Sequence, residues 1–148
     1  MKSIFNPGDN KEIIDRINRL SSGSTAQWGK MNDSQMLAHA QIPIKVSLGE
    51  IKLKRGLIGT LFGSLAKKQL LNDKPFKKNL PTDRSFIIQG IPDFEKEKNS
   101  LMELVQRLGK SSTNLTNEPH PFFGKMKVNE WDTLMIKHLD HHLRQFGV

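Results

Sequence analysis

The chain contains neither cysteine nor tyrosine among its 148 residues. Without cysteine it can form no disulfide and offer no thiolate, so any metal must be held by histidine, aspartate or glutamate. No segment approaches the roughly 20 consecutive apolar residues that cross a membrane. The first residues also lack the apolar run of a secretory signal. We therefore expect a cytoplasmic protein.

Apolar residues are also scarce, at 36% of the chain, yet they recur in periodic segments rather than singly. Such periodicity is typical of a folded protein and not of a disordered one. A chain of this length can bury a core of its own and is most simply one domain, residues 1–148.

Positive charge is concentrated in one segment of a chain whose net charge is +8. Residues 52–78 contain eight cations and a single anion, Asp73. Such a segment can attract nucleic acid, an anionic membrane surface or an anionic substrate, although a run of charge is often only a solvated surface. The segment offers few aromatic rings for base stacking, Phe62 and Phe76, so nucleic acid is the less favoured partner.

Hydrophobic periodicity predicts an all-α protein. Four longer helices and one shorter helix alternate with long loops, a pattern that indicates a four-helix bundle with an additional short helix and long crossover loops. The predicted helices span 10–21, 33–47, 57–71, 94–109 and 128–146.

The shorter helix and the loop after it are the least regular part of this prediction. In the helix, apolar residues gather on one side, including Leu65, and two glycines, Gly59 and Gly63, lie on the other. The loop 72–91 carries at most a short extended piece at Phe86–Ile88. The apolar side of the helix and the basic residues around it are compatible with a homodimer.

Helix 33–47 carries one histidine on its apolar face. Asn32 is a good N-cap, and Gln35 three residues later resembles a capping box. Pro43 cannot donate a hydrogen bond to the carbonyl of His39, so a kink there would change the direction of the His39 side chain.

The last helix carries three of the five histidines. On a helical wheel His138 and His142 lie in the apolar stripe with Trp131, one turn apart. His141 falls at the edge of the stripe, and Asp140 points outward, where we expect it to be solvated.

Buried imidazoles are costly unless each finds a partner, and one metal ion would satisfy His39, His138 and His142 together. Three neutral histidines leave a divalent ion at least one open position, the pattern of catalytic sites. Imidazole suits zinc, nickel, copper and iron, so the ligands alone do not choose the metal. We expect zinc or nickel.

Three alternatives remain open at this point. A single inward histidine is often only a hydrogen-bonded core residue. His141 could exchange roles with His142, because His138 and His141 also form a workable i,i+3 pair. Gln145, one turn after His142, could orient a ligand or merely cap the bundle.

These features resemble the DinB/YfiT-like superfamily of metal-dependent enzymes, and within it a subfamily of unknown function. The resemblance covers nearly the whole chain, and its most specific part is the final His-x-x-x-His-x-x-Gln motif. One departure is Lys127-Val128, where relatives often begin the last helix with a Thr-Pro-like pair. The matching stretches are Trp28–His39, Arg55–Gly63, Asn79–Thr82, His120–Lys125 and Glu130–Gly147.

The resemblance implies a four-helix bundle with a metal held by His39, His138 and His142. It also implies a hydrolase or a thiol-dependent transferase, in which the ion activates water or a substrate thiol. The substrate would be a small molecule, anionic or thiol-containing. The alternative function is a non-catalytic basic module that binds nucleic acid or an anionic membrane surface, with purely structural histidines.

Overall fold

The structure is a computed structural model that describes residues 2–54, 57–72, 74–82 and 84–148, with the side chains of 57–62 left undescribed. Every helix or strand element named within these ranges is helical, so the predicted all-α class is confirmed. The elements are α1 (Pro7–Arg19), α2 (Asp33–Ser47), α3 (Leu57–Leu70), the 3-10 helix η1 (Arg84–Phe86), α4 (Phe94–Gly109) and α5 (Val128–Gln145).

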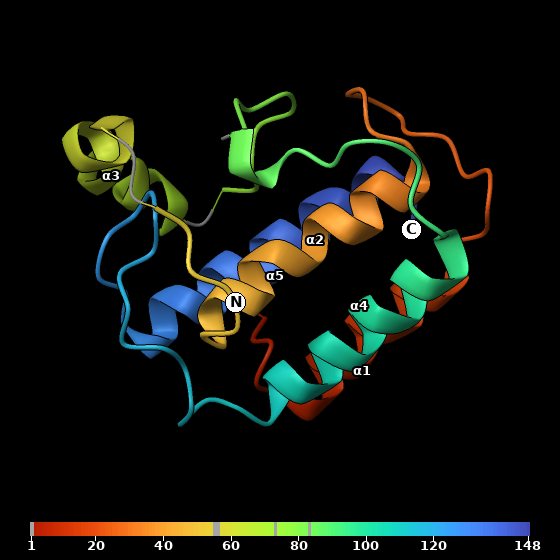
Figure 1. Ribbon diagram of the computed structural model, residues 1–148. Helices are drawn as coiled ribbons and strands as arrows, with labels where there is room; N and C mark the ends of the chain where they lie inside the picture. The colour runs from red at the N-terminus through yellow and green to blue at the C-terminus, as the bar shows by residue number, and fades with distance from the viewer. Residues whose placement is uncertain (1, 55–56, 73, 83) are drawn as a thin grey trace.

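Four helices form the bundle. α2 packs against both α4 and α5, and α1 packs against the same two helices from the other side. α3 stands apart from them at one end, and the chain that follows it passes over α2 and α5 (Figure 1). The core consists of apolar side chains from all four bundle helices, such as Ile17, Leu37, Val105 and Leu139. The predicted arrangement of a bundle with one additional helix is therefore present.

Helix α2 follows the prediction from cap to end. The Asn32 side chain accepts a hydrogen bond from Gln35 N at 2.8 Å, and Gln35 Oε1 accepts one from Asn32 N at 3.1 Å. This reciprocal capping box satisfies two backbone donors at the start of the helix. The helix continues through Pro43 to Ser47, and Pro43 itself is buried. The sequence around His39 therefore stays helical on both sides of that residue.

Helix α1 begins three residues earlier than predicted. The Asn6 side chain accepts hydrogen bonds from the backbone of Gly8 and Asp9, and Pro7 occupies the first helical position. Proline suits that position because its missing N–H would have no partner there. The prediction was wrong at this end because it started from the first apolar stripe and not from the cap.

The prediction for α3 and the loop after it needs two corrections. Gly63, placed on the polar side of the helix, is buried, and an added Cβ would lie 2.1 Å from the carbonyl oxygen of Phe122. Leu65, placed on the apolar side, is 61% exposed. The reason is a close approach between α3 and loop 120–124, which only a residue without a side chain allows. Gly59 lies outside the described side chains.

The second correction concerns residues 86–88, where an extended piece was expected. The chain forms the 3-10 turn η1 at Arg84–Phe86 instead. This turn brings the backbone carbonyl of Phe86 to α2, where it meets His39.

Within the described ranges, no helix has both the length and the apolar character needed to span a membrane.

Candidate metal centre

Three predicted histidines meet between α2 and α5. His39 comes from α2, while His138 and His142 come from successive turns of α5. One ring nitrogen from each lies within 4.8 Å of the other two. The Nε2 atoms of His39 and His138 are 3.1 Å apart. Two nitrogen atoms bound tetrahedrally to one zinc ion at about 2.0–2.1 Å lie about 3.3 Å apart, so this pair is close to a ligand geometry.

The orientation of His39 is set by the loop that passes over α2. Its Nδ1 lies 2.8 Å from the carbonyl oxygen of Phe86, which can only accept a hydrogen bond. Nδ1 must therefore be the protonated nitrogen, and Nε2 carries the lone pair that faces His138. His39 is 5% exposed, so the ring is buried as well as oriented.

The orientation of His142 is set by a glutamine one turn later. His142 Nδ1 lies 2.8 Å from Gln145 Oε1, and Gln145 Nε2 donates to the carbonyl oxygen of Trp28 at 2.6 Å. Both side chains are buried. A hydrogen bond of this kind to the outer nitrogen of a ligating histidine is common in metal sites.

The environment keeps all three rings neutral. Burial lowers the pKa of His142 to about 3, with the neighbouring His39 adding to the effect. Burial also places the pKa of His138 well below its usual value, with His142 and His39 contributing repulsion. Burial lowers the pKa of His39 too, although its hydrogen bond to Phe86 opposes the shift. Neutral imidazole is the form that binds metal, so at neutral pH the three rings are in the protonation state that a metal ion requires.

His141 lies beside this cluster and not in it. Its ring meets the edge of Trp28 at 5.6 Å and of Phe76 at 6.0 Å between centroids. Lys78 Nζ lies 4.4 Å above the Trp28 ring. The structure thus brings His39, His138 and His142 together and places His141 in an aromatic rim next to them.

Asp140 points away from the cluster as predicted, and its side chain stays 38% exposed, but the prediction missed its partner. It forms an ion pair with Arg16 at 2.8 Å, and Arg16 also donates to the carbonyl oxygen of Val148. The partner lies on α1, 124 residues away, so the helical wheel of α5 could not reveal it. This ion pair holds the outer face of α5 against α1.

The fifth histidine, His120, is buried where the sequence suggested only a loop. Its Nδ1 accepts hydrogen bonds from the backbone N–H groups of Phe122 and Phe123, both at 3.1 Å. Its ring packs 5.4 Å from that of Trp131. Burial lowers the pKa of His120 to about 4. The flanking Pro119 and Pro121 were the available signal, because they favour a constrained turn.

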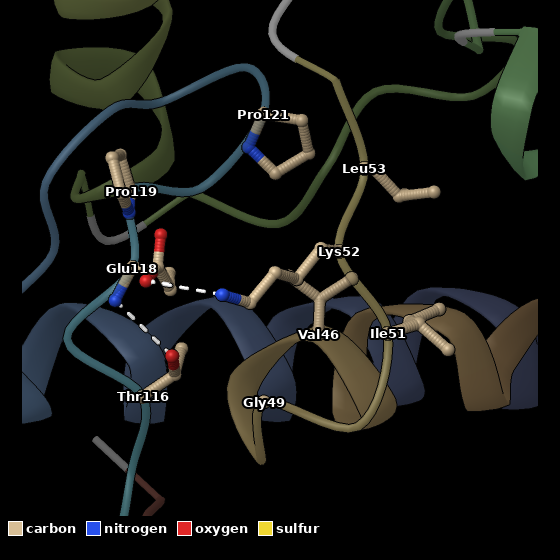
Figure 2. A pocket seen from close by; sticks show the side chains of 9 residues that line it. All are labelled: Val46, Gly49, Ile51, Lys52, Leu53, Thr116, Glu118, Pro119 and Pro121. Carbon is tan, nitrogen blue, oxygen red and sulfur yellow. Dashed lines mark hydrogen bonds and ion pairs between the residues drawn. The ribbon is translucent and has the colours of Figure 1, made fainter.

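Part of the basic segment is already engaged within the chain. Lys67 forms a partly buried ion pair with Glu130 at 2.6 Å and donates to the carbonyl oxygen of Lys125. Lys52 pairs with Glu118 across a small hollow near the end of α2, as Figure 2 shows. Of its lining residues Val46 lies on α2, about two helical turns beyond His39, and none of the three histidines lines it.

The fold and the cluster define an all-helical protein with a candidate three-histidine metal centre. The chain belongs to the family described as a protein of unknown function (DUF1569), whose model matches residues 5–147. The match includes all three clustered histidines. The search of curated proteins found no match, and the search of solved structures found none either.

Proposed function

We propose that this protein is a metal-dependent enzyme whose divalent ion is held by His39, His138 and His142. One observation carries the proposal, namely that three neutral imidazoles from two helices converge within 4.8 Å. The resemblance of the sequence to the DinB/YfiT-like superfamily supports it. The expected ion is zinc or nickel.

Three histidine ligands leave room in the coordination shell for another group. When bound, such an ion acts as a Lewis acid that makes a water molecule or a thiol nucleophilic near neutral pH. The reaction we propose is therefore a hydrolysis or a thiol-dependent transfer. Residues of this chain would hold the imidazoles in place, through the carbonyl of Phe86 and the side chain of Gln145.

The rim of the cluster supports a small anionic or thiol-containing substrate. Trp28 and Phe76 provide apolar surface, and the ammonium group of Lys78 lies over Trp28. The indole Nε1 of Trp28 is buried and has no hydrogen-bond acceptor among the described residues. The ammonium group over this apolar surface favours a small ligand that carries an anionic oxygen or sulfur.

The proposal is tested by measuring the metal content and metal affinity of protein purified without a polyhistidine tag. We expect about one zinc or nickel ion per chain, and loss of tight binding in His138→Ala. His141→Ala serves as the matched control, because His141 adjoins the cluster without contributing to it. Absence of bound metal, or equal affinity in His138→Ala and the unaltered chain, would show that the histidines are structural.

A further inference from the structure

We propose that Gln145 is a positioning residue that makes Nε2 of His142 the metal-binding nitrogen before any ion arrives. The inference deepens the proposed function and rests on it for its purpose. The hydrogen bonds of Gln145 are present in the chain without a metal ion.

The orientation of Gln145 is set by a backbone carbonyl in the loop before α2. The oxygen of Trp28 can only accept a hydrogen bond, and it lies 2.6 Å from one end of the Gln145 side-chain amide. That end must be the NH₂ group, because an amide oxygen there would face another oxygen. The orientation of the Gln145 amide is therefore decided by Trp28.

The amide then decides the state of the histidine. With its NH₂ group on Trp28, Gln145 presents Oε1 to His142 Nδ1 at 2.8 Å. Oε1 can only accept, so Nδ1 must carry the hydrogen of the neutral ring. A neutral imidazole has one N–H, which leaves the lone pair on Nε2.

The loop before α2 is shaped around this glutamine. The backbone N–H of Gln27 donates to the backbone carbonyl of Gln145 at 2.8 Å. Gly29 has a φ of +84°, and a Cβ there would lie 2.6 Å from Gln145 Nε2. Glycine suits both that backbone conformation and that close approach. The loop and the glutamine are thus fitted to each other, which a glutamine that merely caps a helix would not require.

Two of the three proposed ligands are prepared in the same way. His39 meets the carbonyl of Phe86 directly, whereas His142 meets the carbonyl of Trp28 through an amide. The difference matters experimentally, because a side-chain substitution can remove the amide but not a backbone carbonyl. A substitution of Gln145 can therefore remove the hydrogen bond that sets the tautomer of His142 while His142 itself remains.

The test compares two substitutions of this residue. Gln145→Met keeps a side chain of similar length but accepts no strong hydrogen bond. Gln145→Glu keeps an acceptor for His142 and removes the donor to Trp28. We expect Gln145→Met to weaken Co²⁺ and Zn²⁺ binding by about 10- to 100-fold and Gln145→Glu to restore most of that loss. If the residue were only structural, both variants would lose affinity alike.

A second readout needs no metal. Long-range ¹H–¹⁵N NMR of the metal-free protein should show His142 protonated at Nδ1 in the unaltered chain and a mixture of tautomers in Gln145→Met. The matched control is Gln106→Met, since Gln106 is an exposed glutamine on α4, a helix that carries neither the clustered histidines nor the carbonyls that orient them. It should leave both the tautomer and the metal affinity unchanged.

The outcomes separate the two proposals. An unchanged tautomer in Gln145→Met, or unchanged metal affinity in that variant, overturns the positioning role. A chain that binds neither ion overturns the proposed function, while the tautomer measurement still decides whether Gln145 sets His142.

Discussion

Two groups of buried histidines in this molecule use their rings in opposite ways. His39 and His142 donate through Nδ1, to a carbonyl and to an amide oxygen, and leave Nε2 as an acceptor inside the cluster. His120 accepts through Nδ1 from two backbone N–H groups of its own loop. Its remaining N–H is a donor, which cannot bind metal. Burial alone therefore does not distinguish a candidate ligand from a structural histidine, but the partner of the outer nitrogen does.

The largest expected effect is a difference between variants of His120 and His39 in how far zinc stabilises the folded chain. Zinc at about a thousand times its dissociation constant should stabilise the unaltered chain by about 4 kcal/mol. His120→Asn should respond equally, because the asparagine oxygen can replace Nδ1 as acceptor, while His39→Ala should not respond. Thermal unfolding with and without zinc measures this. If zinc stabilised His39→Ala as much as the unaltered chain, His39 would not differ from His120 as a metal ligand.

The burial of His120 should make the free energy of unfolding depend on pH in the acid range. The pKa of His120 is about 4 in the folded chain against 6.5 ordinarily, so below pH 6.5 the unfolded chain binds the additional proton. Stability is thus full above pH 6.5 and declines as the pH falls towards 4, by about 3 kcal/mol from this residue. Between pH 7 and pH 4.5, His120→Asn should lose about 2.4 kcal/mol less in its free energy of unfolding than the unaltered chain, as measured by denaturant unfolding. An identical decline in both chains would contradict the assignment.

Gly63 offers a way to disturb the loop of His120 without touching the cluster. Gly63→Ala would place a Cβ 2.1 Å from the carbonyl oxygen of Phe122, so α3 or loop 120–124 must shift. We expect a loss of about 2 kcal/mol in the free energy of unfolding. Metal affinity should stay unchanged. Ser64→Ala, at the exposed neighbouring position, is the control.

The smallest expected effect concerns the ion pair between α3 and α5. Lys67→Met removes the partner of Glu130, whose side chain is 13% exposed. The loss should be about 1 kcal/mol, because the pair is only partly removed from water. Lys68→Met, its exposed neighbour, should change the free energy of unfolding by less than about 0.5 kcal/mol. Denaturant unfolding of both variants decides whether this pair holds α3 in place.

Local signals in the sequence were enough to predict most helices and the meeting of the histidines. The capping pair Asn32 and Gln35, the helical spacing of His138 and His142, and the place of His39 on an apolar face are all short-range patterns. The structure reproduces the ends they predict for α2 and brings the three rings together.

The features that sequence reasoning missed depend on partners far along the chain. Asp140 finds Arg16 across the bundle, and Gly63 meets a carbonyl that belongs to a different loop. The role of His120 depends on the geometry of a turn, and hydrophobic periodicity does not predict such a turn. The sequence alone does not decide whether Gln145 orients a ligand or caps the bundle, because the carbonyl of Trp28 lies 117 residues away.

The contact between His39 and His138 joins positions 99 residues apart in a chain without cysteine. An ion shared by these two rings would close a loop of that length. Cross-linking a loop of about 100 residues removes enough freedom from the unfolded chain to be worth about 4.7 kcal/mol in the chain-entropy description. Bound to one ion, the two imidazoles would act as a cross-link that a chelator opens and added metal closes.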